Sequence, residues 1–330
     1  MRHDLLTPDA GGLYCAAGDF WIDPLRPVPR AIITHAHADH ARSGSGQVWA
    51  AAEGLALLGE RIGQAGLEGL DYGETLTLGD CSVSLHPAGH IRGSATVRIA
   101  HGGEVWGVSG DFKRAPDPTC SPFEVYGCDV WVSECTFGLP IYRWPPVESI
   151  VAEIIDWAES CFAQDRNAVL FCYALGKAQR LLAELAAAGF GHPVWLHGAM
   201  ARLTGVYRDH GIVLPETPLV SEQSRDQALR GALVLAPPSA AGSPWMRRVE
   251  PCGTGFVSGW MQVRGNRRRR GYDRGFVLSD HADWPALVDT ALATGAGRVI
   301  TIHGQGEHLA RHLADQGLET ASWNLRAGLS

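Results

Sequence analysis

The chain has 330 residues and a formal net charge of −7, and 45% of its residues are hydrophobic against 19% charged. This composition is that of a globular protein; it excludes a disordered chain and gives no overall basic excess of the kind seen in many nucleic-acid-binding proteins. No apolar run reaches the roughly 18 residues of a membrane span, and residues 1–12 contain no apolar signal core, so we expect a cytoplasmic protein without a membrane segment.

The first third of the chain predicts short strands joined by sharp turns. Strand patterns occupy 31–34, 75–85 (two strands and a turn), 95–99, 104–109 and 129–133, and a helical pattern occupies 48–60. The strands at 95–99 and 104–109 form a predicted hairpin. Polar clusters follow several of these strands, where loops on a rigid sheet commonly carry chemistry.

The pattern changes near residue 145. Helical patterns at 148–162 and 177–188 alternate with strand patterns at 168–173, 194–197 and 232–236, which predicts a parallel α/β unit. A strand at 275–279, a helix at 284–293 and a strand at 298–302 then follow. We therefore predict an α/β protein with one domain inserted in another: a first part at 1–146, an insert at 147–250 and a return segment at 251–330.

A cluster of histidines directly follows the predicted strand at 31–34. His35, His37, Asp39 and His40 lie within six residues. Imidazole is a frequent metal ligand, and carboxylates suit hard or borderline divalent ions. Alternate residues of a turn point to different sides, so His35 and His37 are placed to hold one ion while Asp39 and His40 hold a neighbouring one.

Three single residues repeat this placement after a strand. They are His90, Asp111 and His303, and His90 follows a glycine, which allows close backbone approach. With the first cluster they make five histidines and two aspartates, enough for two ions with coordination positions left for water and substrate. A ligand set without thiolates favours zinc or manganese.

The pattern His35-x-His37-x-Asp39-His40, with His90, Asp111 and His303 downstream, resembles the metallo-β-lactamase fold. The resemblance implies an αββα sandwich with two divalent metal ions at the top of its sheets. It assigns one ion to His35, His37, His90 and Asp111, and the other to Asp39, His40, Asp111 and His303. Asp39 is also counted among the catalytic residues. Asp23 matches the family's early aspartate, which orients a histidine ligand without touching the metal.

Further motifs resemble the β-CASP nucleases, in which an α/β domain interrupts the sandwich. They are Ser133-Glu134-Cys135-Thr136, the turn from Tyr173 to Gln179, Ser279-Asp280-His281-Ala282-Asp283, and His303. Residues 18–24 and 31–41 are similar to bacterial ligase-associated DNA exonucleases, relatives of Artemis and ribonuclease J. This likeness implies single-stranded nucleic acid as the substrate, DNA in preference to RNA, and a functional association with a DNA ligase and a helicase.

Phosphodiester cleavage also fits the residues on chemical grounds. It needs an activated water, charge neutralisation on the phosphate and a proton for the leaving oxygen. Two adjacent ions supply the first two requirements. His281 is the candidate proton donor, and Glu134 is the carboxylate expected to keep it protonated.

An arginine-rich segment is the predicted contact with the phosphate backbone. Six arginines less one aspartate, Asp273, give it a net charge of +5; they are Arg264, Arg267, Arg268, Arg269, Arg270 and Arg274. Trp260 and Tyr272 flank the run and are candidates for stacking on bases. Lys177 opens a predicted helix after Gly176, a position suited to binding an anion.

The sequence therefore predicts a metal-dependent phosphodiesterase acting as a single-strand DNA exonuclease in DNA repair. An RNA-processing exo- or endonuclease is the close alternative, because the resemblance makes histidine at position 303 more typical of RNA-processing members. A small-molecule metallo-hydrolase is disfavoured by the insert and by the Glu134 and His281 pair. A non-catalytic nucleic-acid-binding subunit is disfavoured by the intact ligand set.

Overall fold

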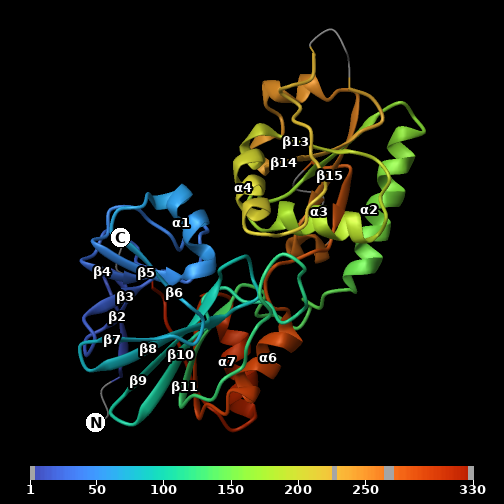
Figure 1. Cartoon of the computed structure of the whole chain (residues 1–330). Coiled ribbons are helices and arrows are strands. Elements are labelled where there is room, and N and C mark those ends of the chain that lie inside the picture. The colour runs from blue at the N-terminus through green and yellow to red at the C-terminus, as the bar shows by residue number, and fades with distance from the viewer. Residues whose placement is uncertain (1–3, 225–228, 264–270, 326–330) are drawn as a thin grey trace. The chain divides into compact units, whose positions relative to one another are not determined.

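The computed structural model describes residues 4–224, 229–263 and 271–325. The chain forms two compact units, the first comprising Met1–Arg143 and His281–Ser330 and the second Trp144–Asp280 (Figure 1). Among the described residues, no helix is both long enough and apolar enough to cross a membrane.

The first unit contains two sheets. The six-stranded sheet follows chain order, β1 (Leu6–Asp9), β2 (Gly12–Cys15), β3 (Phe20–Ile22), β4 (Arg30–Ile32), β5 (Gln47–Ala51) and β6 (Leu67–Leu70). The seven-stranded sheet has the order β18 (Glu319–Ser322), β17 (Arg298–Gly304), β11 (Val130–Cys135), β10 (Glu104–Val108), β9 (Ala95–His101), β8 (Cys81–Pro87) and β7 (Thr75–Leu78). Strands β7 to β10 pair antiparallel, whereas β10, β11, β17 and β18 pair parallel.

Alternation of side chains along the central strands builds two layers of core. On β11, Val130 and Val132 pack in the core between the two sheets, while Trp131 between them packs in a second core with Leu287 and Leu309. Those two leucines belong to α6 (Trp284–Ala293) and α7 (Gly306–Asp315), which cover the outer face of the seven-stranded sheet.

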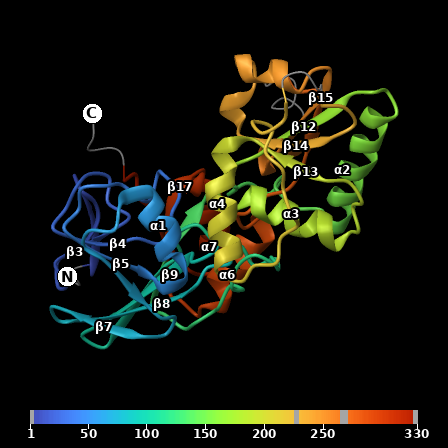
Figure 2. The ribbon, with the colours of Figure 1, turned by 45° about the horizontal axis from the view of Figure 1, so that its top comes forward.

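On the other side of the sandwich, α1 (Leu55–Ile62) follows the short helix η1 (Ala52–Gly54) and lies beside β6. Figures 1 and 2 show α1 on the side of the first sheet, and α6 and α7 beside the second. The unit is therefore an αββα sandwich, which confirms the predicted fold.

The second unit is built on a five-stranded parallel sheet in the order β13 (Val194–Leu196), β14 (Leu233–Ala236), β12 (Asn167–Phe171), β15 (Cys252–Val257) and β16 (Arg274–Phe276). Every residue of β12 and β14 is buried, as expected for central strands of a parallel sheet covered on both faces. Among the described residues, the helices of this unit are α2 (Val147–Phe162), α3 (Lys177–Ala187), α4 (Gly198–Asp209) and the short η2 (Pro238–Ala240), η3 (Pro244–Arg248) and η4 (Gly259–Gln262). The inserted α/β domain is thus present.

The predicted helix at 48–60 is wrong over its first part. Gln47–Ala51 is the strand β5, paired in parallel with β4 and β6, and the α-helix begins only at Leu55. Residues 48–51 are buried and include two alanines. A short, continuous apolar run of this kind has no period that separates a buried strand from a helix.

The insert extends further along the chain than the predicted boundary at residue 250. β15 pairs with the whole length of β12, and β16 pairs with β15, so residues up to Asp280 belong to the second unit. The sequence after residue 251 alternates strand, polar turn and helix, and that pattern is the same whichever sheet the strands join.

Candidate metal centre

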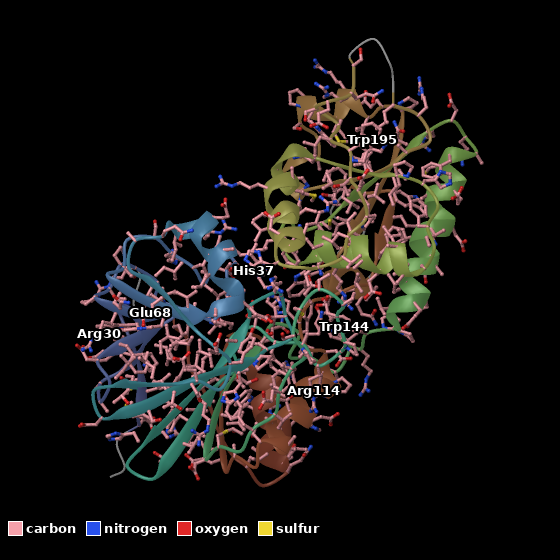
Figure 3. The ribbon with its side chains drawn as sticks, in the orientation of Figure 1. Arg30, His37, Glu68, Arg114, Trp144 and Trp195 are labelled. Carbon is pink, nitrogen blue, oxygen red and sulfur yellow. The ribbon has the colours of Figure 1, made fainter. Side chains whose placement is uncertain are left out.

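The parallel strands of the sandwich bring distant polar residues to one edge. β10, β11 and β17 run in the same direction as neighbours, so their carboxyl ends meet. Asp111 lies just beyond β10, Glu134 near the end of β11, and His303 near the end of β17. The histidine cluster follows β4 of the other sheet, and His37 is labelled in Figure 3.

Two glycines are required where the loops that carry ligand residues pass close to other parts of the chain. Gly89 and Gly110 directly precede His90 and Asp111 and have φ angles of 68° and 54°. A Cβ on Gly89 would lie 2.3 Å from the carbonyl oxygen of Lys113, and a Cβ on Gly110 would lie 2.8 Å from Cβ of Thr34. Only glycine fits both the left-handed backbone and the available space.

Three imidazoles surround one carboxylate oxygen. Nδ1 of His37 lies 3.1 Å from Nε2 of His35 and 3.0 Å from Nε2 of His90. Oδ2 of Asp111 lies 3.4 Å from Nε2 of His35 and 3.7 Å from Nε2 of His90. Four donors bound to one tetrahedral zinc at about 2.0–2.1 Å would be roughly 3.3 Å apart. The donor set therefore fits one divalent ion held by His35, His37, His90 and Asp111.

The protonation states of His35 and Asp111 favour metal binding. Burial lowers the pKa of His35 well below the ordinary histidine range, so its imidazole is neutral and has a lone pair to donate. Burial opposes ionisation of Asp111, but His40 and His281 hold the pKa of its carboxyl well below the ordinary range. The pKa values of both residues thus favour the protonation states that bind metal.

A second set of predicted ligands includes His40, which also lies close to Asp111. Nε2 of His40 is 3.4 Å from Oδ2 of Asp111 and 3.9 Å from Oδ2 of Asp39. The ring of His303 lies 5.7 Å from that of His40. The side chain of Asp39 is 62% exposed, so it borders solvent. Asp39, His40, Asp111 and His303 therefore form a looser, more open group than the first, and the two groups share Asp111.

His303 reaches this group through an irregularity in its strand. The pairing of β17 with β11 changes register between Glu134 and Cys135, and His303 adopts a φ of 54° at that point. A bulge of this kind redirects a side chain, and it is common next to active sites. Burial, followed by the nearby His40, lowers the pKa of His303, which favours the neutral imidazole.

Asp23 contacts Nδ1 of His40, the ring nitrogen that does not face Asp111. Its Oδ2 lies 2.7 Å from Nδ1 of His40, and its two oxygens accept hydrogen bonds from the amide and hydroxyl of Thr34. Asp23 itself has a φ of 44°, a strained conformation of the kind that gathers at functional sites. Sequence reasoning missed Thr34, although its hydroxyl group directly precedes His35 in the chain.

Buried Glu134 pairs with half-buried His281 beside the metal ligands. Nδ1 of His281 lies 3.0 Å and 3.2 Å from the two oxygens of Glu134, and its Nε2 lies 4.0 Å from Oδ2 of Asp111. Glu134 also accepts hydrogen bonds from the amide of Phe112 and the hydroxyl of Thr136. No sequence pattern could indicate a role for Phe112, because its backbone amide and not its side chain makes the contact. The ring of His281 is thereby oriented with Nε2 toward the ligands.

Of the charged residues predicted to contact nucleic acid, the structure describes only Arg274 and Lys177. Arg264, Arg267, Arg268, Arg269 and Arg270 lie outside the described residues, while Arg274 is exposed on β16. Lys177 is buried, and its ammonium lies 2.8 Å from Oδ2 of Asp280 within the second unit, so it does not present a free charge to an anion there.

The two aromatic residues predicted to stack on bases are partly buried in the core of the second unit. Tyr272 stacks on Phe256 with ring centroids 5.1 Å apart and an angle of 5° between the planes. Trp260 packs against the same core. Part of each ring is therefore used for packing within the second unit, and stacking of either residue on bases stays a prediction.

Comparison with curated proteins gives several relatives, although no family model matches the chain. The chain is 35% identical over 93% of its length to a protein of Opitutus terrae named "Probable DNA ligase", of which it covers 30%. It is 28% identical over 57% of its length to "Ribonuclease TTHA0252" of Thermus thermophilus, of which it covers 50%. It is 24% identical over 42% of its length to "RNase aCSPSF2" of Saccharolobus solfataricus, of which it covers 28%. The chain thus spans half or less of the length of these relatives.

A solved structure shares the fold. It is described as "Crystal Structure of a Protein of Unknown Function from Enterococcus faecalis V583" and matches with a TM-score of 0.55 at 13% sequence identity. The match covers 89% of this chain and 78% of that one. At this identity the likeness is one of architecture alone.

Proposed function

We propose that this chain, which belongs to the metallo-β-lactamase/β-CASP nuclease family, is a two-metal phosphodiesterase that degrades single-stranded DNA as an exonuclease in DNA repair. The observation that carries the proposal is the group of buried His35, His90 and Asp111 with half-buried His37, beside the His281 and Glu134 pair. Metal ligands and a candidate proton donor are thereby gathered around one carboxylate.

Each residue has a role in phosphodiester hydrolysis. The two ions, zinc or manganese, would be held by the two ligand groups and would supply a hydroxide nucleophile and neutralise charge on the phosphate. Asp23 holds His40 in its ligand orientation. Glu134 stabilises the protonated form of His281, and His281 delivers a proton from Nε2 to the leaving oxygen.

DNA is the proposed substrate because of the relative with which the chain aligns over most of its length. That relative carries the name "Probable DNA ligase" and is 35% identical over 93% of this chain. The RNA alternative rests on two other relatives, whose names are those of ribonucleases, and on His303, which lies beside His40. Because the same chemistry cleaves the phosphodiesters of DNA and RNA, an experiment must distinguish between these two substrates.

The discriminating experiment uses a DNA strand and an RNA strand of the same sequence, each labelled at one end. The metal-free protein is reconstituted with zinc or with manganese and incubated with each strand. We expect stepwise shortening of the DNA from one end, slower or no cleavage of the RNA, and no cleavage after chelation. Faster RNA cleavage would transfer the assignment to RNA processing, and no cleavage of either strand would contradict a nuclease function.

We further propose that the chain acts together with a DNA ligase and a helicase. The ligase part follows from the name of the Opitutus relative, and the helicase part from the resemblance of residues 18–24 and 31–41 to ligase-associated exonucleases. The expected result is comigration with the ligase of the same organism in size-exclusion chromatography, and faster joining of strands whose ends need trimming. Separate elution together with an unchanged joining rate would contradict this association.

A further inference from the structure

The second unit contains a buried group of charged side chains that the proposed reaction does not use. Asp280 lies between two cations of α3: its Oδ2 is 2.8 Å from Nζ of Lys177, and its Oδ1 is 3.3 Å from Nη1 of Arg180. The side chains of Lys177 and Arg180 are 3% exposed and that of Asp280 5%. Glu184, 3.6 Å from Nε of Arg180, balances the second cation.

The same two cations also hold the backbone that leads out of β16. Nζ of Lys177 donates a hydrogen bond to the carbonyl oxygen of Leu278 at 3.2 Å, and Nη1 of Arg180 donates to that of Ser279 at 2.8 Å. This segment lies beyond the last residue of β16, and its two carbonyl groups accept hydrogen bonds from side chains of α3. Buried carbonyl groups need hydrogen-bond donors, and α3 supplies them.

The next residue in the chain is His281. On its other side, the amide of Ala282 donates to the carbonyl oxygen of Phe112 at 2.6 Å, and His281 itself contacts Glu134. Within the second unit, side chains of α3 thus hold the backbone up to Asp280, and within the first unit the loop that carries Asp111 holds the backbone after His281.

We propose that Arg180 and Lys177 are positioning residues for His281. They fix Leu278, Ser279 and Asp280 in one conformation and so restrict the backbone from which the next residue, His281, continues. This role rests on the proposed function, because it presupposes that His281 donates the proton. It also gives Lys177 a task other than the phosphate contact predicted from the sequence.

The test compares Arg180→Met, which removes the charge and the donors, with Arg180→Lys, which keeps a charge and donors in the same place. We expect kcat of Arg180→Met on an end-labelled single strand to fall roughly 10- to 100-fold, since small displacements of a catalytic group have effects of this size. KM and metal content stay within about twofold, because the variant changes neither ligands nor substrate contacts. Arg180→Lys recovers most of the lost kcat.

A matched control separates positioning from loss of stability. Asn167 is buried at the opposite end of the same sheet, where its side chain donates to the carbonyl oxygens of Leu229 and Val249. Asn167→Ala removes buried hydrogen bonds from the second unit without touching the segment before His281. We expect it to lower the melting temperature and leave kcat unchanged.

A second readout does not depend on turnover. In the metal-free protein, hydrogen exchange at the amides of residues 278–282 should be faster in Arg180→Met than in wild type and unchanged in Asn167→Ala. If Arg180→Met fails to fold, Lys177→Met combined with Asp280→Asn removes one cation together with its anion and leaves no uncompensated charge. The double variant is expected to show the same loss of kcat.

The proposal is overturned if the loss of kcat in Arg180→Met is no larger than in Asn167→Ala, or if exchange at 278–282 is unchanged. Failure of the proposed function gives a different result. In that case the metal-loaded wild type would itself degrade no single strand, whatever the variants do. If the wild type prefers RNA, the same comparison is made on RNA.

Discussion

Nδ1 of His281 lies 3.0 Å from Oε1 of Glu134, although 147 positions separate the two residues in the sequence. The carboxylate is itself fixed by the amide of Phe112 at 3.0 Å, so it orients the imidazole rather than following it. Nε2 of His281 lies 4.0 Å from Oδ2 of Asp111. A proton donor directed toward a metal-bound phosphate needs this arrangement.

The first prediction concerns that donor. His281→Ala should lower cleavage roughly 10²–10⁴-fold, the usual effect of losing a positioned acid, and leave metal content unchanged. Exposed His192, which pairs with Glu159, provides the control variant His192→Ala, with normal activity expected. The ligand atoms of Asp111, Glu134 and His281 are also close enough to share an ion. Loss of one metal equivalent in His281→Ala would therefore make His281 a ligand and refute its role as the acid.

The second prediction concerns Asp23. Asp23→Ala should weaken metal binding about 10- to 100-fold, because residues that orient a ligand histidine have effects of this size. The measurement is competition with a chelator of known affinity. Asp19→Ala is the control: Asp19 also has a positive φ, but it is exposed and pairs with Arg30. Equal affinity in the Asp23 variant and the wild type would show that His40 does not need Asp23 to bind metal.

The third prediction concerns the arginine-rich segment. Alanine at Arg267, Arg268, Arg269 and Arg270 should weaken binding to all single strands alike, because phosphate contacts carry little sequence information. Each lost contact should reduce the slope of log affinity against log salt by about 0.7. Turnover at saturating substrate should change little. An unchanged salt slope would mean that the segment makes no phosphate contacts, and a collapse of turnover with normal binding would instead place an arginine at the reacting phosphate.

The fourth prediction concerns the pH dependence of stability at His86 on β8. Burial lowers the pKa of His86, whose Nε2 lies 3.1 Å from Oγ of Ser84, even though Glu124 opposes the shift. The unfolded chain takes up a proton near the ordinary histidine value of about 6.5 while the folded protein does not. This contribution to stability is therefore present above that value and lost as the pH falls through the window down to the lowered pKa. On acidification, the melting temperature of His86→Gln should fall less than that of the wild type. If both melting temperatures fell equally with pH, His86 would not be the source of this pH dependence.

Much of the site could be predicted because its residues lie at strand ends with strong local signals. His35, His37 and His40 stand close together in the sequence, and glycines before His90 and Asp111 mark close backbone approach. Their convergence needed only the rule that parallel strands end at a common edge.

Other features depend on contacts that the sequence does not display. Thr34 and the amide of Phe112 act through hydrogen bonds whose partners lie 11 and 22 residues away. The burial of Lys177 and Tyr272 is decided by the packing of the insert, and neither residue type alone separates a surface contact from an internal one. The strand β5 was mistaken for a helix because residues 48–51 are buried without a period.

The central claim is a pair of metal ions sharing Asp111, and anomalous diffraction from crystals of the manganese- or zinc-loaded protein tests it most directly. Two anomalous peaks are expected about 3.5–4 Å apart, the separation found in two-metal hydrolases. One should lie among His35, His37 and His90, and the other beside His40. Asp111→Ala should lose both peaks while keeping the fold. A single peak at full metal loading, or two peaks that persist without Asp111, would contradict the claim.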